Sequence, residues 1–275
     1  MIRAGLKAAV LGSPISHSLS PFIHNAAYSL LDIEGMYSAI EVKSGEIGAF
    51  LKSAEVEDFR GFSVTMPLKE EAALLASNLD PHAALTGSVN TLIRSESGWQ
   101  GFNTDVTGIR TLINELGFLG DRKGTVAILG AGGTARAALA AVSDFATRQV
   151  FRRSLARDEA LRKIDSKVQI VDWSAVNSSL ECDLLISTVP AEASGFSLAD
   201  WHMGSVIDAI YSPWPPPITK YCLQNKIPLA SGLDLLLAQA MDQIRLMTEV
   251  DFNATDLRKE IGLDLSKAHG IPQGK

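Results

Sequence analysis

The chain has 275 residues, 46% of them hydrophobic and 20% charged, which is typical of a globular protein long enough for two domains. A formal net charge of -6 argues against a general nucleic-acid or anionic-membrane surface, and no segment approaches the roughly 18 uninterrupted apolar residues of a membrane span or the pattern of a signal peptide. Cys182 and Cys222 are too few for a disulfide framework and lack the clustering of metal ligands, so we expect a cytoplasmic protein with reduced thiols, no metal, and no nucleic-acid or membrane partner.

The first hundred residues alternate between strand and helix patterns. Residues 6–11 form an apolar run that ends at a Gly-Ser-Pro turn, which predicts a buried strand. Ser20 is expected to cap the next helix, with Pro21 at its first helical position. The remaining expected elements are strands over 37–42, 61–65 and 88–94 and helices over 47–51 and 70–76. This alternation predicts an open, largely parallel sheet.

A second alternation begins after the polar break at residues 120–124. The strand expected over 125–129 has no polar residue inside it, as in a sheet covered on both faces, and an alanine-rich helix follows over 135–142. Residues 213–217 read as a stiff surface turn, and Gly262 as a natural stop for the last helix. The other expected elements are short strands over 149–151, 168–171, 183–187 and 206–209 and helices over 233–248 and 255–261.

These patterns predict two open α/β domains, the C-terminal one a Rossmann-type doubly wound parallel sheet, with a helical C-terminal tail. We expect a substrate-binding and catalytic domain over residues 1–105 and a nucleotide-binding domain over 106–232. The tail, residues 233–275, is expected to pack back on the N-terminal domain. The oligomeric state stays open between a monomer and a homodimer.

A glycine loop lies between the strand over 125–129 and the helix after it. The run Gly130-Ala131-Gly132-Gly133-Thr134-Ala135 has the G-x-G-x-x-[G/A] spacing of a dinucleotide fingerprint. Gly130 permits the tight turn, Gly132 lets the backbone approach a pyrophosphate, and Ala135 keeps helix and sheet close. The helix N-terminus then faces the phosphates with unpaired N–H groups.

The end of the next strand distinguishes between the two nicotinamide cofactors. An NAD site places an acid there, roughly 20 residues after the loop, to bind the ribose 2′-hydroxyl. Here the chain reads Arg152-Arg153-Ser154, two guanidiniums and a hydroxyl that suit a 2′-phosphate. We therefore predict NADP(H), with Arg157 assisting or facing water and Arg152 either binding or only a solvated charge.

Candidate substrate groups lie in the first half. Lys69 and Asp105 precede the glycine loop and are the parts needed for a proton transfer coupled to a hydride transfer. The hydroxyls of Ser18 and Ser20 lie at a helix start, where they either bind a small carboxylate or act as turn and cap residues. Asn90 ends an apolar strand, where it donates to a substrate hydroxyl or closes its own turn.

In their order along the chain, these motifs resemble those of the shikimate dehydrogenases. The resemblance is carried by Ser18-x-Ser20-Pro21, Ser63-Val64-Thr65-Met66-Pro67-Leu68-Lys69, Gly87-Ser88-Val89-Asn90-Thr91, Asn103-Thr104-Asp105, the glycine loop and Gly232-Leu233-Asp234-Leu235-Leu236-Leu237-Ala238-Gln239-Ala240. It implies NADP-dependent interconversion of 3-dehydroshikimate and shikimate on the route to aromatic amino acids. Ser18 and Ser20 would hold the carboxylate, and the ring hydroxyls would be surrounded by Thr65, Lys69, Asn90, Asp105, Tyr211 and Gln239.

The resemblance also extends the cofactor site. Gly232 would lie beside the nicotinamide, and Ser187 and Ala209 are further expected cofactor positions, along with Ala131, Gly133 and Thr134 in the loop. Three departures stand out: Ser63 replaces the usual Asn, Arg152-Arg153-Ser154 replaces Asn-Arg-Thr, and Ser187-Thr188-Val189-Pro190 replaces a common Asn-Ala-Thr. None removes a catalytic group, although the first puts the rigidity of the loop before Lys69 in question.

Within this resemblance Lys69 is the expected proton donor and acceptor, and Asp105 is expected to orient it. The alternatives are a dual quinate/shikimate dehydrogenase, a non-catalytic sensor that keeps the fold and binds NADP(H), and another two-domain dehydrogenase such as one for methylene-tetrahydrofolate. Intact Lys69 and Asp105 argue against the sensor, and the Ser18-x-Ser20 pair argues against the folate enzyme.

Overall fold

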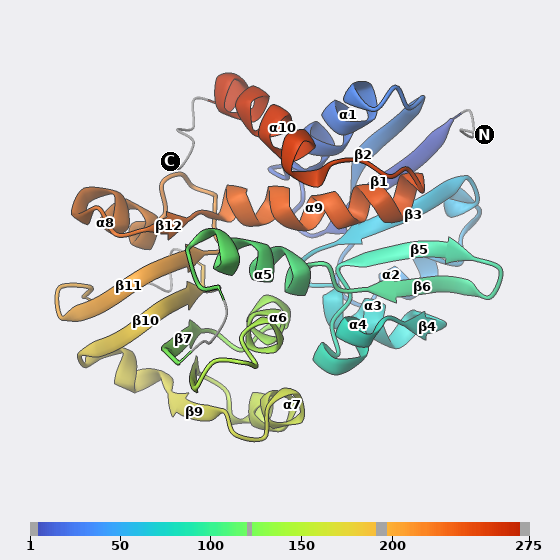
Figure 1. Cartoon of the computed structure of the whole chain (residues 1–275). Helices are drawn as coiled ribbons and strands as arrows, with labels where there is room; N and C mark the ends of the chain where they lie inside the picture. The colour runs from blue at the N-terminus through green and yellow to red at the C-terminus, as the bar shows by residue number, and fades with distance from the viewer. Residues whose placement is uncertain (1–4, 120–122, 191–196, 270–275) are drawn as a thin grey trace. The chain divides into compact units, whose positions relative to one another are not determined.

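The structure is a computed structural model that describes residues 5–119, 123–190 and 197–269 (Figure 1). The described chain divides into two compact units. Unit 1 comprises the residues up to Thr104 together with those from Leu237 onward, and unit 2 runs from Asp105 to Leu236. Helix α9 (Gly232–Thr248) begins in unit 2 and continues into unit 1.

Unit 1 is built on a six-stranded sheet in the order β2-β1-β3-β5-β6-β4. Its strands are β1 (Leu6–Gly12), β2 (Gly35–Glu41), β3 (Phe59–Val64), β4 (Asn78–Leu79), β5 (Thr91–Ser95) and β6 (Gly98–Phe102). Its helices are α1 (Ser20–Leu30), α2 (Ile47–Phe50), the 3-10 turn η1 (Ala54–Val56), α3 (Lys69–Leu75), α4 (Pro81–Thr86), most of α9, and α10 (Ala254–His269). The tail helix α10 packs against α1 (Figure 1).

Both faces of the unit 1 sheet are covered, as the apolar run of β1 indicates. Successive side chains of a strand point to opposite faces, so Ala9 and Leu11 enter one core cluster and Ala8 and Val10 another. The first cluster includes Ile47 of α2, Ala72 of α3 and Ala83 of α4. The second includes Tyr28 of α1 and Met247 of α9. Two layers of helices therefore hold this sheet.

Unit 2 is a six-stranded parallel sheet in the order β12-β11-β10-β7-β8-β9. If β7 to β12 are numbered 1 to 6 and the sheet is read from β9, the order is the 3-2-1-4-5-6 of a Rossmann fold, which confirms the predicted fold class. Its strands are β7 (Thr125–Leu129), β8 (Thr147–Arg152), β9 (Gln169–Asp172), β10 (Leu180–Ser187), β11 (Trp201–Asp208) and β12 (Leu229–Ala230). Its helices are α5 (Asp105–Glu115), α6 (Gly133–Ala141), η2 (Leu155–Arg157), α7 (Asp158–Ile164), η3 (Trp173–Asn177) and α8 (Pro217–Asn225).

Three sequence-based expectations for the fold were wrong. Ser20 makes no capping hydrogen bond: Leu19 is the N-cap, and the Ser18 hydroxyl instead accepts from the N–H of Ser20 at 3.3 Å. The unit 1 sheet is mixed, because β5 and β6 form an antiparallel hairpin and β5 also runs antiparallel to β3. Helix α10 does not stop at Gly262 but runs on to His269, since one glycine costs a helix only about 1 kcal/mol.

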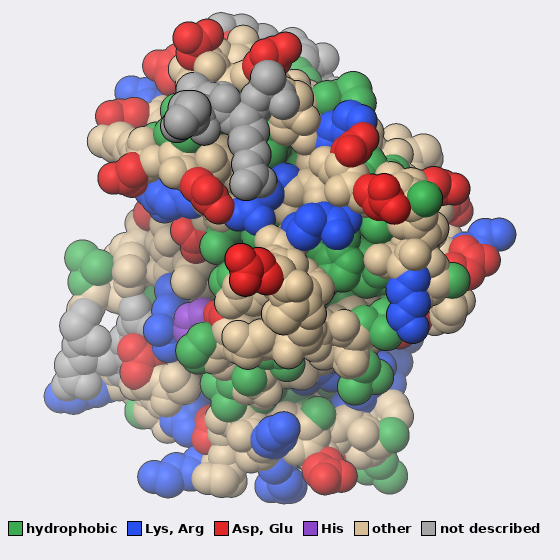
Figure 2. Space-filling view, turned by 90° about the vertical axis from the view of Figure 1, so that its right-hand side faces the viewer, with side chains coloured by type: hydrophobic (Ala, Val, Ile, Leu, Met, Phe, Trp, Pro, Cys, Tyr) green, Lys and Arg blue, Asp and Glu red, His purple; other side chains and the backbone are tan. Residues whose placement is uncertain are grey.

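Acidic and basic side chains are interspersed on the surface shown in Figure 2. Surface ion pairs within unit 1 include Lys7 with Asp58 at 3.0 Å and Arg60 with Glu249. Among the described residues, no helix is long and apolar enough to cross a membrane.

Candidate functional site

One edge of the unit 1 sheet gathers the expected substrate residues. Strands β1 and β3 are parallel, so their carboxyl ends lie at the same edge, and antiparallel pairing of Thr91 with Ser63 brings the start of β5 there as well. Strand β6 ends at this edge too, because Phe102 pairs with Thr91. The segments that flank these strand ends carry Ser18, Ser20, Thr65, Lys69, Asn90 and Thr104.

Lys69 is the first residue of α3, and its side chain is half-buried. Its carbonyl oxygen accepts from the N–H of Val89 at 2.9 Å, which holds the start of α3 beside the segment that leads to Asn90. Thr65 donates its N–H to the carbonyl of Leu11 at 2.9 Å. A Cβ on Gly12 would lie 2.5 Å from the Cγ2 of Thr65, so the end of β1 and Thr65 approach closely only because residue 12 is glycine.

The side chains of Asn90, Thr104 and Gln239 form one buried cluster. Asn90 Nδ2 lies 2.9 Å from Thr104 Oγ1 and 3.3 Å from Gln239 Oε1, and the N–H of Thr104 donates to Asn90 Oδ1 at 2.9 Å. Gln239 lies on α9, so this long helix places the Gln239 amide beside Asn90 and Thr104 at the sheet edge. The alternative interpretation of Asn90 as a residue that only closes its own turn does not fit, since the amide contacts residues far along the chain.

Asp105 directly follows Thr104 and is the first residue of α5 and of unit 2. Its side chain is only 5% exposed. Thr104, a member of the Asn90 cluster, is the last residue of this part of unit 1, so the division between the units falls between Thr104 and Asp105.

A second set of buried polar side chains, which the sequence patterns did not identify, adjoins this cluster. Gln243 bridges Asn90 and Thr91 to Ser63, and the Tyr37 hydroxyl donates to Ser63 Oγ at 2.6 Å. His24 stacks on Tyr37 with ring centroids 3.9 Å apart and contacts Gln243 Oε1 at 3.3 Å. Burial lowers the pKa of His24 to about 3, so the ring is neutral near pH 7 and serves packing.

In unit 2 the glycine loop has the backbone that a dinucleotide site requires. Gly130 has φ +105°, and a Cβ there would lie 2.5 Å from Thr188 Oγ1, so both backbone conformation and space require glycine. Gly132 is the N-cap of α6, it is exposed, and no atom lies within 4 Å of where its Cβ would be. Gly133 and Thr134 begin the helix after Ala131 and Gly132. The structure therefore gives no internal reason for glycine at 132, whereas a bound phosphate group would need that space.

The two arginines at the end of β8, Arg152 as its last residue and Arg153 directly after it, lie in different surroundings. Arg152 is buried, and its guanidinium contacts Asp158 (Nε–Oδ1, 2.7 Å) and Asp172 (Nη1–Oδ2, 2.8 Å). Hydrogen bonding to Arg152 lowers the pKa of Asp158. Arg153 is exposed, with Ser154 exposed beside it and Arg157 half-buried one short turn later. The expectation that Arg152 is either a phosphate ligand or a solvated charge needs correction, because two carboxylates already occupy its guanidinium.

The other expected cofactor positions lie at the carboxyl ends of unit 2 strands, the edge where open α/β sheets bind ligands. Ser187 ends β10 and accepts at its carbonyl from the N–H of Ala209 at 2.8 Å. Tyr211, which was expected to bind substrate, lies two residues after Ala209 in unit 2 and is half-buried. Gly232 has a structural reason of its own, since a Cβ there would lie 2.6 Å from the Ile210 backbone. Asp208 ends β11 beneath this edge, and burial raises its pKa to about 6.

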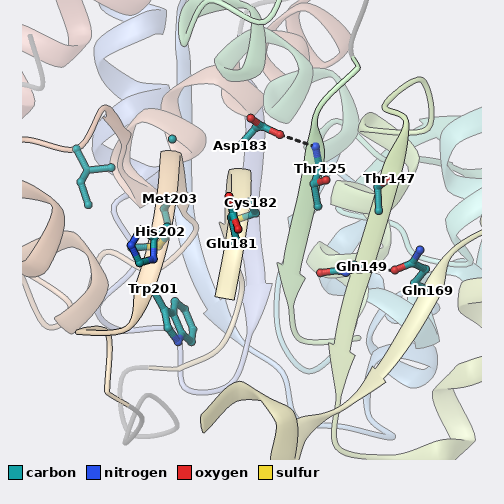
Figure 3. A pocket seen from close by; sticks show the side chains of 12 residues that line it. Thr125, Thr147, Gln149, Gln169, Glu181, Cys182, Asp183, Trp201, His202 and Met203 are labelled. Carbon is teal, nitrogen blue, oxygen red and sulfur yellow. Dashed lines mark hydrogen bonds between the residues drawn. The ribbon is translucent and has the colours of Figure 1, made fainter. Parts of the chain in front are cut away.

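The opposite end of the unit 2 strands forms an open groove of about 800 Å³ (Figure 3). It is lined by the early residues of β7, β8, β10 and β11, among them Thr125, whose N–H donates to Asp183 at 2.7 Å. The groove therefore lies away from the glycine loop and is not the dinucleotide site. Cys182 contributes to its lining, and burial raises the pKa of this thiol to about 12, so the thiol stays protonated.

Within the part of the chain that the structure describes, no three His, Cys, Asp or Glu side chains are grouped to hold a metal ion. Both cysteines are free and buried.

Comparisons with known proteins agree with this architecture. Residues 10–92 match the family model described as the shikimate dehydrogenase substrate binding domain. A shikimate dehydrogenase (NADP(+)) from Ignicoccus hospitalis is 33% identical over 242 residues, which cover 85% of this chain and 90% of that protein.

Solved structures are similar over nearly the whole chain. The crystal structure of Mycobacterium tuberculosis shikimate dehydrogenase aligns with a TM-score of 0.79 at 30% identity, covering 94% of this chain and 99% of that one. Shikimate 5-dehydrogenase from Thermus thermophilus, in complex with NADP(H) and shikimate, aligns with a TM-score of 0.80 at 28% identity, with coverage of 94% and 99%.

The Rossmann sheet, the glycine loop and these likenesses define an α/β oxidoreductase built from two units. The chain belongs to the shikimate dehydrogenase family. The resemblance read from the motifs is thereby confirmed.

Proposed function

We propose that this protein catalyses the NADP-dependent, reversible reduction of 3-dehydroshikimate to shikimate on the route to aromatic amino acids. The observation that carries the proposal is the cluster of Asn90, Thr104 and Gln239 at the same sheet edge as Ser18, Ser20, Thr65 and Lys69. A site lined by amides and hydroxyls suits a small ring that carries several hydroxyls, because each hydroxyl must exchange its water contacts for protein contacts. The family relationship identifies which hydroxylated acid this is.

We assign the substrate carboxylate to Ser18 and Ser20. Their segment leads into the N-terminus of α1, where N–H groups and the helix dipole favour an anion. The Ser20 hydroxyl is not used as a helix cap, which supports a binding role for it. Ring hydroxyls are assigned to Thr65, Asn90 and Gln239 of unit 1. Tyr211 of unit 2 is kept as a substrate residue on the family resemblance.

Reduction of a ketone needs a hydride and a proton. When bound, NADPH supplies the hydride. Lys69 donates a proton to the carbonyl oxygen as negative charge develops there and accepts it back in the reverse reaction, a step typically worth factors of ~10²–10⁴. Asp105 orients the Lys69 ammonium and the neighbouring substrate hydroxyl.

The cofactor is assigned to unit 2. The open space at Gly132 and the N-terminus of α6 suit the pyrophosphate, while Arg153 and Ser154, with Arg157 nearby, suit the 2′-phosphate of NADP. No acid stands at the end of β8 to bind an unmodified ribose. We give Arg152 a structural part instead, as the partner of Asp158 and Asp172. Ser187, Ala209 and Gly232 complete the edge on which the nicotinamide half would lie.

The two assignments imply a division of labour between the units: residues 1–105 and the tail from 233 bind substrate, and residues 106–232 bind cofactor. We further propose that the enzyme works in the cytoplasm. The substrate assignment is tested by comparing shikimate with quinate as reductants of NADP⁺, followed by the absorbance of the reduced nicotinamide. We expect shikimate to be oxidised with much the higher kcat/KM. Comparable values would identify a dual quinate/shikimate dehydrogenase, and no oxidation of either would refute the proposal.

A further inference from the structure

A continuous path of hydrogen bonds crosses the interior of unit 1 and ends at the proposed substrate amides. It joins three sheet strands (β2, β3 and β5), helix α1 and helix α9, and every side chain in it is at most 7% exposed. Its members are His24, Tyr37, Ser63, Asn90, Thr91, Thr104, Gln239 and Gln243. Burying this many polar side chains costs free energy unless each one makes its hydrogen bonds, so the presence of the path requires an explanation beyond packing.

The orientation of the Gln243 amide follows from one backbone contact. Gln243 Nε2 lies 3.2 Å from the carbonyl oxygen of Asn90, which can only accept a hydrogen bond. The nitrogen of Gln243 must therefore face the strand, and its second proton goes to Thr91 Oγ1 at 2.9 Å. The Gln243 oxygen then faces the other way, where it accepts from Ser63 Oγ at 2.8 Å.

The directions of the hydrogen bonds that lead from Gln243 to the Asn90 oxygen are then determined. Thr91 uses its oxygen to accept from Gln243, so its single proton is directed to Asn90 Oδ1 at 2.9 Å. The N–H of Thr104, which can only donate, points to the same oxygen at 2.9 Å. Two independent donors thus fix the Asn90 amide with its oxygen inward and its nitrogen toward Thr104 and Gln239.

The far end of the path is fixed in the same way. Tyr37 donates to Ser63, and Ser63 donates to Gln243, so the serine hydroxyl must both accept and donate. The asparagine that is usual in the family at position 63 is larger than the serine found here. In this chain the Ser63 hydroxyl accepts from Tyr37 and donates to Gln243, so it is held from both sides.

We propose that Gln243 and Thr91 are positioning residues, which hold the Asn90 amide in the one orientation that directs its nitrogen to Thr104 and Gln239 and so sets this polar cluster for substrate recognition. The inference rests on the proposed function, and it extends that function to residues behind the site. A flipped Asn90 amide would place an acceptor where a donor is needed. Buried amide sites discriminate strongly on this basis, since a mismatched pair leaves a polar group unsatisfied.

The test uses Thr91→Val, which removes one hydroxyl at nearly constant volume, with Thr91→Ser as the conservative rescue. We expect Thr91→Val to raise the KM for shikimate about tenfold, the scale of one buried hydrogen bond, while the KM for NADP⁺ changes less than about twofold. Thr91→Ser should restore the shikimate KM. Thr86→Val is the matched control, because Thr86 is equally buried in unit 1 and bonds to His82, Ser88 and Asn103 rather than to Asn90.

A double-mutant cycle separates positioning from general support. If Thr91 acts through Asn90, Thr91→Val should have little further effect on shikimate KM in an Asn90→Ala background. An equal effect in both backgrounds, or an equal effect of Thr86→Val, would overturn the proposal.

The orientation itself can be measured without substrate. In the wild-type protein, the Asn90 side-chain NH₂ signals should exchange with solvent more slowly than in Thr91→Val, as followed by NMR. Equal exchange rates would also overturn the proposal. Because this readout needs no turnover, a protein that fails to oxidise shikimate would refute the proposed function while the positioning of Asn90 was still decided.

Discussion

The guanidinium carbon of Arg153 lies 4.9 Å from the centroid of the Trp173 ring. A guanidinium over an aromatic face keeps its plane fixed and its N–H groups directed outward around the rim, which is the arrangement that binds phosphate oxygens in pairs. Trp173 begins η3, directly after β9, so the neighbouring strand of the sheet supports the arginine.

Replacing Arg153 with alanine should therefore weaken NADP(H) selectively. We expect the KM for NADP⁺ to rise about 10- to 100-fold, the scale of lost charge-assisted hydrogen bonds, and the KM for NAD⁺ to change much less. Steady-state kinetics with both cofactors at saturating shikimate measure the two values. Equal losses for NADP⁺ and NAD⁺ would show that Arg153 does not contact a 2′-phosphate.

Arg152→Gln should have a different effect from its neighbour. The substitution removes the partner of Asp158 and Asp172, and the melting temperature of the protein should fall. The ratio of kcat/KM for NADP⁺ to that for NAD⁺ should stay near the wild-type value, because the guanidinium is occupied within the protein. A collapse of that ratio without loss of thermal stability would contradict the structural role.

Lys69→Ala should leave cofactor binding nearly intact and lower kcat by a hundredfold or more, the scale of lost acid–base catalysis. Fluorescence titration with NADPH and steady-state rates with shikimate provide the two measurements. Turnover close to the wild-type rate would remove Lys69 from the mechanism.

The two loop glycines should respond differently to alanine. Gly132→Ala meets no atom of the protein, so stability should be retained while the KM for both cofactors rises about tenfold, as expected if a pyrophosphate approaches that backbone. Gly130 has a positive φ, and the added Cβ of Gly130→Ala would lie 2.5 Å from Thr188 Oγ1, so this substitution should cost about 1–3 kcal/mol of stability. Thermal melts and cofactor kinetics on both variants distinguish the roles, and an unstable Gly132→Ala would mean that its glycine is structural.

His24 should make stability depend on pH. Its folded-state pKa of about 3 lies below the ordinary 6.5, so as pH falls below 6.5 the unfolded chain takes up a proton that the folded chain does not. Stability is therefore lost between pH 6.5 and about 3, by roughly 2 kcal/mol at pH 5. His24→Phe, which can keep the stack on Tyr37, should lose less stability than wild type between pH 7 and pH 5 in urea unfolding. Identical pH dependence in the two proteins would exclude this role.

The sequence predicted those helices and strands whose ends are set by neighbouring residues in the chain. Strand β7 matches the expected 125–129 at both ends, because an apolar run lies between Gly124 and Gly130. Strand β6, and with it the β5–β6 hairpin, was not predicted, since Gly98 and Gly101 lower the strand propensity of that segment. Gly101 is required by packing, as a Cβ there would lie 2.7 Å from Val89 Cγ2. Helix α5 was also missed, although Val106, Ile109 and Ile113 repeat at helical spacing.

The site was predictable where it followed motifs and unpredictable where it depended on distant contacts. Asn90 was expected to end an apolar strand but directly precedes β5, and its partner Gln239, 149 positions away, came only from the family resemblance. Gln243 lies 180 positions from Ser63, and no local pattern links them. Its position one helical turn after Gln239 was the single available signal. Arg152 and Arg153 look alike in sequence, and only the placement of Asp158 and Asp172 separates their roles.

The rates of shikimate oxidation with NADP⁺ and with NAD⁺, measured on the same preparation, test the proposed activity and the cofactor assignment together. We expect readily measurable turnover with NADP⁺ and a kcat/KM at least about tenfold lower with NAD⁺, the least that one missing phosphate contact should cost. Absence of turnover with NADP⁺, or a clear preference for NAD⁺, would contradict this expectation.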